Sequence, residues 1–324
     1  MADQPLAGSQ DGERQTQSEI AITAADPVLS PASAEQHDGD KGMAFNKALE
    51  KTARTRFSRE DDVQRWVSYW GETVKRNEEL LRAFQGRAEL DFAGKVVLDV
   101  GCGTGGLAKT ICEAGGRYVG VDFHYILSFA ALLIGDLDTD RASIARSSAT
   151  HLPLISESVD YVIAFDVVEH LVGGYQWQLQ FMREMQRVLR PGGLILFTTQ
   201  NKLYPMEGHT FLPFPHYLPS ALADRYVRWR RPGFFEEYDS FKEVVLLSPW
   251  ALRRLLKQSS LALLHDLPWC MDREDHRPRE RHLLRLLHGI GLDWGWTKGF
   301  WLVAARQEDL PRVRELKRKQ WLRE

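Results

Sequence analysis

Short apolar runs alternate with longer amphipathic stretches through the middle of the chain. Runs that fit buried strands lie at residues 96–100, 117–122, 142–149, 160–166 and 194–199. Stretches that fit helices lie between them, at residues 107–113, 125–137 and 175–189. Because strands and helices alternate, the pattern predicts an α/β fold with a doubly wound, mostly parallel sheet and helices on both faces.

The first of these strands ends in an acid, Asp99, and a glycine-rich turn at residues 101–106. Glycine lets the backbone turn sharply and approach a ligand closely, and the helix that follows offers free N–H groups at its start. The second strand also ends in an acid, Asp122, whose carboxylate can accept hydrogen bonds from both hydroxyls of a ribose. These features indicate a nucleotide-type site at the first strand-to-helix crossover.

Three ligands fit this loop to different degrees. The spacing of Gly101, Gly103 and Gly106 satisfies the fingerprint of a dinucleotide fold. A phosphate loop is disfavoured because Ala108 occupies the position of its second glycine. Asp99 favours S-adenosylmethionine, because a carboxylate at the mouth of the strand repels a pyrophosphate and suits the cationic methionine end of that cofactor.

Together with Leu152-Pro153 and residues 165–171 and 189–199, these motifs resemble those of the class I S-adenosylmethionine-dependent methyltransferases. The likeness is greatest to the small-molecule group that includes the ubiquinone- and menaquinone-biosynthesis enzymes. It implies a Rossmann-like sheet of seven strands, completed by a helix at residues 248–259 and strands at 261–266 and 300–306. It also implies S-adenosyl-L-methionine as the cofactor. The residues expected to bind it are Asp99, Gly101, Cys102, Gly103, Thr104, Gly105, Asp122, Phe123, Ser148, Ala149, Phe165 and Asp166.

One position departs from the family pattern. Many relatives carry an acid before the alanine that Ala149 matches, and that acid accepts a hydrogen bond from the adenine amino group. Ser148 stands there in this chain. Its hydroxyl can accept the same bond without a charge, or it can serve only as a turn residue.

Composition divides the rest of the chain. Residues 1–42 are rich in small and polar side chains, and we expect a disordered tail because such a segment buries too little apolar surface. Residues 43–88 carry apolar side chains at helical spacing and predict a helical cover. The cofactor-binding core then spans residues 89–200 and resumes at 248–307, and a basic helix is expected at 308–324.

Charge and cysteine usage exclude several classes of protein. The formal net charge of −2 gives no global basic field for nucleic acid. Cys102, Cys112 and Cys270 lack the spacing of a metal site or a disulfide framework, so no metal is expected. With no secretory segment and no transmembrane run, the expectation is a cytoplasmic protein. The sequence does not set its oligomeric state.

A segment rich in proline and aromatic residues follows the fifth strand. Prolines between residues 205 and 219 hold it rigid and mostly non-helical. It leaves the carboxyl end of a central strand, where α/β sheets bind their ligands. We therefore interpret residues 201–247 as an inserted substrate lid, in which Tyr204, Glu207 and His216 are expected to contact the substrate.

The chemistry of methyl transfer limits the catalytic residues that are needed. A sulfonium cofactor is already a strong electrophile, so the protein needs a base only when the acceptor is a hydroxyl. His170 follows the fourth strand and His209 lies in the lid, and an imidazole suits removal of a hydroxyl proton. Each could also be a structural histidine. No Asn/Asp-Pro-Pro-aromatic motif follows the fourth strand, which disfavours methylation of an exocyclic amine.

The sequence thus predicts a methyltransferase that acts on a small-molecule acceptor, at a hydroxyl oxygen, with a histidine base. Three stretches are rich in arginine, at residues 225–231, 273–285 and 312–319. Each fits a solvated helix face, and together they also suit an anionic acceptor or an anionic membrane surface. That leaves a peripheral-membrane enzyme for a lipid, a quinone precursor or a lipid-linked glycan as one alternative. A regulator that binds the cofactor without turnover is another.

Overall fold

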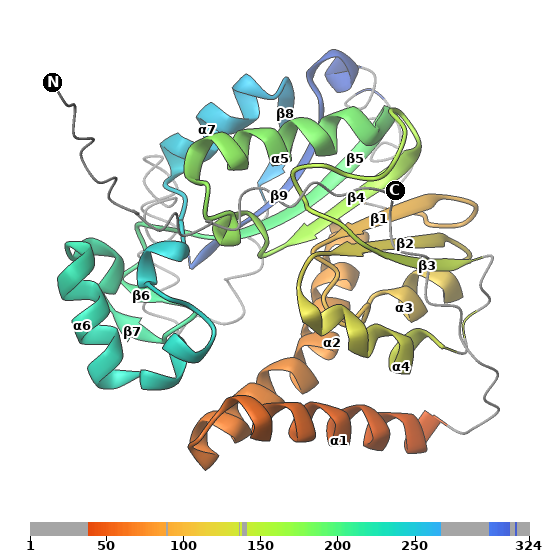
Figure 1. Ribbon diagram of the computed structural model, residues 1–324. Coiled ribbons are helices and arrows are strands. Elements are labelled where there is room, and N and C mark those ends of the chain that lie inside the picture. The colour runs from red at the N-terminus through yellow and green to blue at the C-terminus, as the bar shows by residue number, and fades with distance from the viewer. Residues whose placement is uncertain are drawn as a thin grey trace, which may run out of the picture.

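A seven-stranded sheet forms the centre of the molecule. The computed structural model describes residues 38–88, 90–135, 137, 141–266, 298–311 and 315. The strands lie in the order β3-β2-β1-β4-β5-β9-β8, as Figure 1 shows. Their bounds are β1 Val96–Val100, β2 Arg117–Asp122, β3 Ala142–Arg146, β4 Val159–Phe165, β5 Leu189–Gln200, β8 Leu261–Asp266 and β9 Gly299–Arg306. β9 runs antiparallel to both β5 and β8, and β1 to β5 pair in parallel. The predicted doubly wound α/β fold is confirmed.

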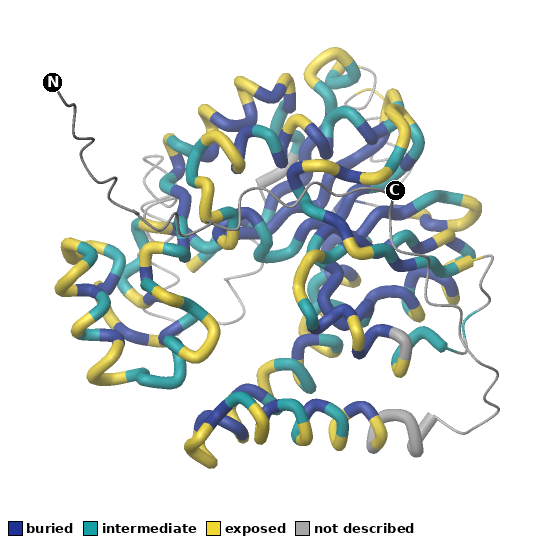
Figure 2. The backbone as a smooth tube through the Cα atoms, viewed as in Figure 1, coloured by how far each residue is buried: buried dark blue, intermediate teal, exposed yellow. Residues whose placement is uncertain are grey.

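Helices cover both faces of this sheet, which is why its central strands are almost continuously apolar. On one face lie α5 (Gly174–Val188) and α7 (Pro249–Gln258), and on the other lie α3 (Ala108–Glu113), α4 (Ala130–Ile134) and the end of α2 (Glu60–Ala88) (Figure 1). Figure 2 shows the buried backbone concentrated in the strands and on the helix sides that face them. The core therefore fixes the carboxyl ends of β1, β4 and β5 relative to one another.

The N-terminal helices form a smaller apolar cluster. Phe45, Leu49 and Ala53 of α1 (Asp38–Arg56) pack with Trp66 of α2 and with Phe129. Because α1 begins at Asp38, residues 38–42 are helical and do not belong to the tail that the sequence placed at 1–42. Residues 1–37 lie outside the described residues.

Two other boundaries differ from the sequence prediction. Where one helix was predicted over residues 125–137, the structure has a 3-10 helix, Tyr125–Phe129, followed by the short α4, Ala130–Ile134. β3 ends at Arg146 and a turn replaces the predicted strand over 147–149. The first difference divides one predicted helix into a 3-10 and an α segment, and the second lies at a strand end, where short-range signals are weakest.

The insertion leaves the sheet and returns to it at a single place. Asn201 bridges to Leu247, and the Lys202 N–H donates to the Leu247 carbonyl at 2.9 Å. Between these ends, β6 (Met206–Glu207) pairs with β7 (Leu212–Pro213), and α6 (Ser220–Arg230) follows. A separate small core holds the insertion together and consists of Leu212, Ala223, Val227 and Phe241. In Figure 1 the insertion forms a lobe beside the sheet.

Several sequence predictions fall on parts of the chain that the structure does not describe. Cys270, the arginine-rich stretch at 273–285 and most of the predicted basic helix at 308–324 lie outside the described residues. Within the described part of the chain, no helix has the length and the apolar content needed to cross a membrane.

Candidate active site

The glycine-rich turn after β1 has a backbone that requires glycine. Gly101, Gly103 and Gly105 have φ angles of 72°, 54° and 71°, in the left-handed region. A Cβ on Gly101 would lie 2.4 Å from Val167 Cγ2, and one on Gly103 would lie 3.3 Å from a ring carbon of Trp70. Thr104 and Cys102, the other expected ligand residues of the turn, are buried within it. The turn is therefore closely packed between α2 and the segment that follows β4.

Asp122 ties the end of β2 to this turn. Its Oδ2 accepts a hydrogen bond from the Gly103 N–H at 2.7 Å, and its Oδ1 accepts one from the His124 N–H at 2.7 Å. A carboxylate can accept about four hydrogen bonds, so it keeps capacity for two further donors. The neighbouring Phe123 is 64% exposed and is free to cover a ligand.

Asp99 lies beneath the turn and is only 5% exposed. Burial raises the pKa of its carboxyl to about 7, although the hydrogen bond that the Tyr118 hydroxyl donates at 2.9 Å acts in the opposite direction. Burial also raises the pKa of the adjacent Cys102 thiol. A cation bound at the turn would stabilise the ionised form of Asp99, which is a physical match to the ammonium group of the expected cofactor.

The remaining expected cofactor residues lie at the ends of β3 and β4. The Ser148 hydroxyl accepts a hydrogen bond from the Thr150 N–H at 3.3 Å, so it already caps the turn that contains Ala149. Phe165 stacks on Phe84 of α2, with ring centroids 5.6 Å apart. Asp166 has a φ of 55°, and its carboxylate accepts a hydrogen bond from the Thr198 hydroxyl at 2.9 Å.

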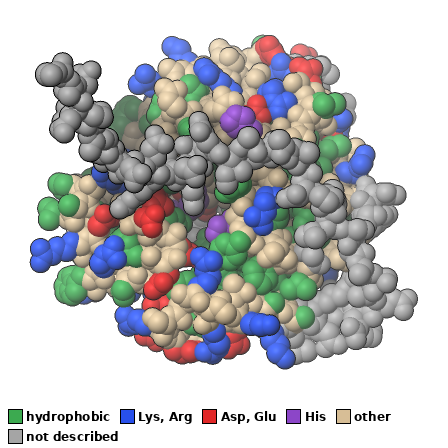
Figure 3. Space-filling view, viewed as in Figure 1, with side chains coloured by type: hydrophobic (Ala, Val, Ile, Leu, Met, Phe, Trp, Pro, Cys, Tyr) green, Lys and Arg blue, Asp and Glu red, His purple; other side chains and the backbone are tan. Residues whose placement is uncertain are grey.

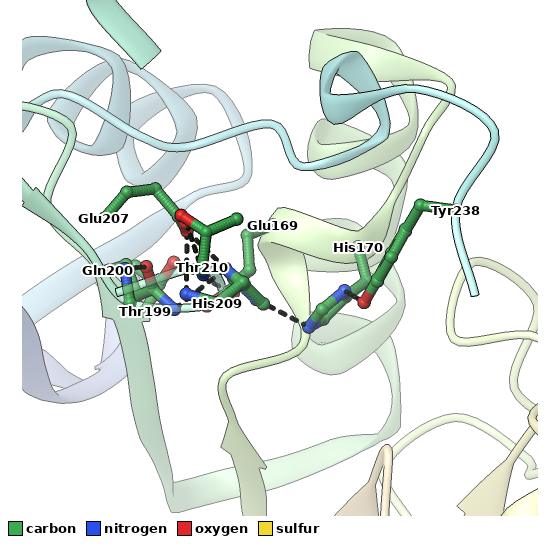
Figure 4. Close-up of polar contacts among 9 residues, drawn as sticks. Glu169, His170, Thr199, Gln200, Glu207, His209, Thr210 and Tyr238 are labelled. Carbon is green, nitrogen blue, oxygen red and sulfur yellow. Dashed lines mark hydrogen bonds and ion pairs between the residues drawn. The ribbon is translucent and has the colours of Figure 1, made fainter. Parts of the chain in front are cut away.

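The two predicted bases meet although they lie in different parts of the sequence (Figure 4). His209 Nε2 lies 3.3 Å from His170 Nε2, and His209 Nδ1 lies 2.6 Å from Glu207 Oε1. On the other side of His170, its Nδ1 lies 3.4 Å from the Tyr238 hydroxyl. We call Glu207, His209, His170 and Tyr238 the imidazole chain. It joins the end of β4 to two segments of the insertion.

The two histidines of the imidazole chain have pKa values that are shifted in opposite directions. Burial alone raises the pKa of Glu207, but the hydrogen bonds and charge of His209 and the bonds from Thr210 lower it to about 2. Burial lowers the pKa of His209, but the hydrogen bond and charge of Glu207 outweigh this effect and raise it. Desolvation by the surrounding protein, followed by the charge of His209, lowers the pKa of His170, although the residue is exposed on the molecular surface. Positive charge is therefore more stable on His209 than on His170.

Glu169 lies beside this chain and is completely buried. Its Oε2 accepts a hydrogen bond from the Thr199 hydroxyl at 3.0 Å, while its Oε1 has no partner among the described residues. Burial, followed by the charge of Asp166, raises its pKa to about 7. Its backbone carbonyl accepts a hydrogen bond from Val245 at 2.7 Å and so ties the turn after β4 to the end of the insertion.

The N-terminal helices contact the insertion as well as the glycine turn. The Trp66 indole N–H of α2 donates to Glu237 of the insertion at 2.6 Å. One helical turn further along α2, Trp70 stacks on His124 with ring centroids 6.3 Å apart. Thus α2 connects the predicted cofactor turn to the predicted lid.

Sequence analysis found most of the polar residues at this site but not their partners. It named His170, His209 and Glu207, which the structure joins. Tyr204 and His216 lie in the same insertion, where the Tyr204 N–H donates to Asn201 and the His216 ring packs on Tyr217 at 4.3 Å. It missed Tyr238, which is 68 positions from His170, because no local pattern links residues that far apart.

Comparison with known proteins identifies the class. Residues 98–197 match the family described as "Methyltransferase domain". An "Uncharacterized methyltransferase" of Mycolicibacterium paratuberculosis is 33% identical over 183 residues, which cover 56% of this chain and 68% of that protein. A "Probable S-adenosylmethionine-dependent methyltransferase" of Mycolicibacterium smegmatis is 38% identical over 112 residues, covering 34% of this chain and 40% of that protein. The crystal structure of an S-adenosylmethionine-dependent methyltransferase from Mesorhizobium loti is 16% identical with a TM-score of 0.48, covering 69% of this chain and 96% of that chain.

The chain belongs to the class I S-adenosylmethionine-dependent methyltransferases. Its cofactor is S-adenosyl-L-methionine. The closer likeness to enzymes of quinone biosynthesis stays a prediction.

Proposed function

We propose that this methyltransferase acts on a hydroxyl oxygen of a small-molecule acceptor and that His170 is the base. The bound cofactor supplies a methyl group on a positively charged sulfur. The protein must then hold the acceptor oxygen in line and accept its proton. The observation that carries this proposal is the direct contact between His170 and His209, with Glu207 behind them.

The hydrogen bonds of the imidazole chain define a route for that proton. Ionised Glu207 accepts from His209 Nδ1–H, which leaves His209 Nε2 to accept from His170 Nε2–H. This arrangement leaves the lone pair of His170 Nδ1 facing the Tyr238 hydroxyl. An acceptor hydroxyl that took the place of the Tyr238 hydroxyl would donate to the same nitrogen. The tautomer of His209 is assigned from the shorter contact of its Nδ1, 2.6 Å to Glu207 Oε1, over the 3.1 Å contact of the same nitrogen with Gln200 Nε2.

The lowered pKa of His170 and the raised pKa of His209 favour movement of the proton from His170 toward His209. As the oxygen–methyl bond would form and the methyl–sulfur bond would break to leave a neutral thioether, the oxygen–hydrogen bond of the acceptor would break and its proton would pass to His170 Nδ1. His170 then passes its Nε2 proton to His209, where the charge is stabilised by Glu207. The positive charge finishes next to a carboxylate, as it does when an imidazolium is stabilised by an acid in other general-base pairs.

The same proposal assigns the cofactor contacts. Asp122 would accept from the ribose hydroxyls, Asp99 would face the methionine ammonium group, and Phe123 would cover the adenine. Support comes from the spare acceptor capacity of Asp122, the buried carboxyl of Asp99 and the exposure of the Phe123 ring. The insertion at 201–247 would be the substrate lid, because it supplies Glu207, His209 and Tyr238. A cytoplasmic location stays a prediction.

Histidine variants test the base assignment. His170→Ala and His209→Ala should keep cofactor binding in calorimetry, because neither residue lies in the glycine turn. Methyl transfer from radiolabelled cofactor to hydroxyl acceptors should fall by about 10²–10⁴-fold for His170→Ala, the usual contribution of a general base. The loss should be partly recovered at high pH, where hydroxide replaces the base.

The matched control is His216→Ala, which removes an imidazole of the same insertion from outside the imidazole chain. Because His216 is an expected substrate contact, its loss should raise KM but leave kcat and its dependence on pH close to those of the wild type. Unchanged turnover in both His170→Ala and His209→Ala would show that the enzyme works by positioning alone. A protein that binds the cofactor but labels no acceptor in any form would instead be the non-catalytic regulator.

A further inference from the structure

The insertion carries an unusual amount of exposed apolar surface. Half of the exposed large hydrophobic side chains in the described chain lie within residues 206–229, and they are Met206, Phe211, Phe214, Tyr217, Leu218, Leu222 and Trp229. Soluble surfaces usually expose such side chains singly, and a contiguous group of them marks an interaction site. Figure 3 shows hydrophobic and basic side chains together on the lobe that contains α6.

α6 has apolar side chains on two sides. Ala223 and Val227 face inward and belong to the small core of the insertion. On the other side, Leu222 is 54% exposed and Trp229 is 74% exposed. The outer face of α6, which we define as Leu222, Arg225, Tyr226 and Trp229 together with Leu218 just before the helix, lines a shallow hollow of about 670 Å³. Packing within the insertion buries the inner side of α6, whereas the outer face stays exposed.

The charges of α6 are also separated by side. Its acid, Asp224, faces inward and accepts hydrogen bonds from the Ser240 hydroxyl at 3.0 Å and the Phe241 N–H at 2.8 Å. Its exposed charged residues are all arginines, namely Arg225, Arg228 and Arg230. The Arg230 guanidinium lies 5.2 Å from the centre of the Trp229 ring, so cation and indole share one surface. The exposed face is therefore both apolar and positively charged.

We propose that the outer face of α6 docks on the surface of an anionic lipid bilayer. An amphipathic helix with tryptophan and leucine beside arginines binds in the plane of a membrane, because the apolar side chains enter the headgroup boundary while the cations meet anionic lipids. A tryptophan suits that depth because its ring is apolar and its N–H is polar. Charge complementarity favours this occupant over a second copy of the chain, since two identical arginine-rich faces repel each other.

The docking face lies on the same insertion that we propose as the substrate lid. The same insertion carries Glu207, His209 and Tyr238, so docking would hold the proposed lid at the membrane, where amphiphilic acceptors reside. The docking proposal does not depend on which histidine is the base. It can therefore succeed or fail separately from the proposed function.

Vesicle co-sedimentation of the full-length protein tests the proposal. The protein should bind vesicles of phosphatidylcholine mixed with phosphatidylglycerol, bind poorly to phosphatidylcholine alone, and dissociate at about 1 M salt, where the Debye length falls to about 3 Å. The double variant Leu222→Ser/Trp229→Ser should lower the apparent affinity by about tenfold or more. Arg225→Gln/Arg230→Gln should lower it by about fivefold per arginine.

Two matched control variants distinguish binding through this surface from non-specific binding to vesicles. Trp250→Ser removes another exposed tryptophan, 67% exposed on α7, and Lys257→Gln removes an exposed cation from the same helix. Both should bind vesicles like the wild type, and all variants should bind the cofactor normally. The proposal fails if the wild type ignores anionic vesicles, or if Trp250→Ser reduces binding as much as Trp229→Ser. It also fails if Trp229→Ser only abolishes self-association in sedimentation analysis, which would assign the face to a second copy.

Discussion

Two buried carboxyl groups of this protein have opposite properties because their neighbours differ. Glu207 and Asp99 are both at most 5% exposed. Glu207 accepts hydrogen bonds from His209 and Thr210, and the pKa falls to about 2. Asp99 has the Tyr118 hydroxyl as its donor, and burial raises its pKa to about 7. The number and charge of the donors decide which acid holds a negative charge at neutral pH.

This contrast predicts how the pH dependence of catalysis changes in Glu207→Gln. The proposed proton route requires a neutral His209, so turnover should rise with pH through the pKa of His209. Glu207 raises that pKa, so the acidic limb of the wild type should lie above the ordinary histidine value of about 6.5. Removing the charge should lower the pKa, shift the limb to lower pH and reduce the plateau. The measurement is a kcat/KM profile against pH.

Glu237→Gln provides the control, since Glu237 is an acid of the same insertion that bonds to Trp66 and not to the imidazole chain. Its acidic limb should coincide with that of the wild type. If the acidic limb of the kcat/KM profile does not shift in Glu207→Gln, a group other than His209 controls this pH dependence.

At the scale of elements, the active site depends on contacts between segments that belong to different layers. α2 reaches the glycine turn through Trp70 and the insertion through Trp66. The turn after β4 reaches the insertion through the imidazole chain and through the bond from Val245 to Glu169. Cofactor turn, base and lid therefore form one connected structure.

Gly103→Ala tests the contact between α2 and the glycine turn. Alanine disfavours a φ of 54°, and its Cβ would lie 3.3 Å from Trp70. Affinity for S-adenosylmethionine in calorimetry should fall by about tenfold or more, equivalent to about 1.4 kcal/mol. Gly192→Ala is the control, because Gly192 also has a positive φ, 79°, but no atom lies within 4 Å of the added Cβ. The turn would not approach the cofactor as proposed if the two variants bound it equally well.

At the scale of the whole molecule, buried acids make the free energy of unfolding depend on pH. Glu169 has a folded-state pKa raised to about 7 and an ordinary value of about 4.3 when unfolded. The stability associated with its protonated form is therefore complete below about pH 4 and is lost as the pH rises through about 7. Above about pH 7 the buried, ionised Glu169 therefore lowers the free energy of unfolding, and this residue lies beside the imidazole chain.

Glu169→Gln should remove this dependence. At pH 4 the variant and the wild type should have similar free energies of unfolding, because both side chains are neutral. At pH 8 the variant should be more stable by up to about 3 kcal/mol, from a pKa shift of between two and three units. Urea unfolding at several pH values measures the difference. A difference that is constant with pH would show that Glu169 is not titrating in this range.

The sequence by itself determined the class of fold and the cofactor. Apolar runs of strand length, each ended by Asp99 or Asp122 and a turn, are local signals, and they predicted the sheet and the glycine turn at the observed positions. The start of the insertion was marked by a segment rich in proline and aromatic residues, and its end by the helix expected at residues 248–259; the structure bridges Asn201 to Leu247. Such features are readable because the physics behind them acts between residues close in sequence.

Only the tertiary structure decided which side chains work together. His170 and His209 were separate alternatives in the sequence, and the fold made them neighbours at 3.3 Å, with Glu207 on one side and Tyr238 on the other. Ser148 was assigned a role toward the adenine or in the turn, and the structure engages its hydroxyl with Thr150. Burial and charge pairing depend on segments far apart in the chain, and so do the pKa values that polarise the imidazole chain. No local pattern encodes them, because they arise only when β4, the insertion and α2 pack against one another.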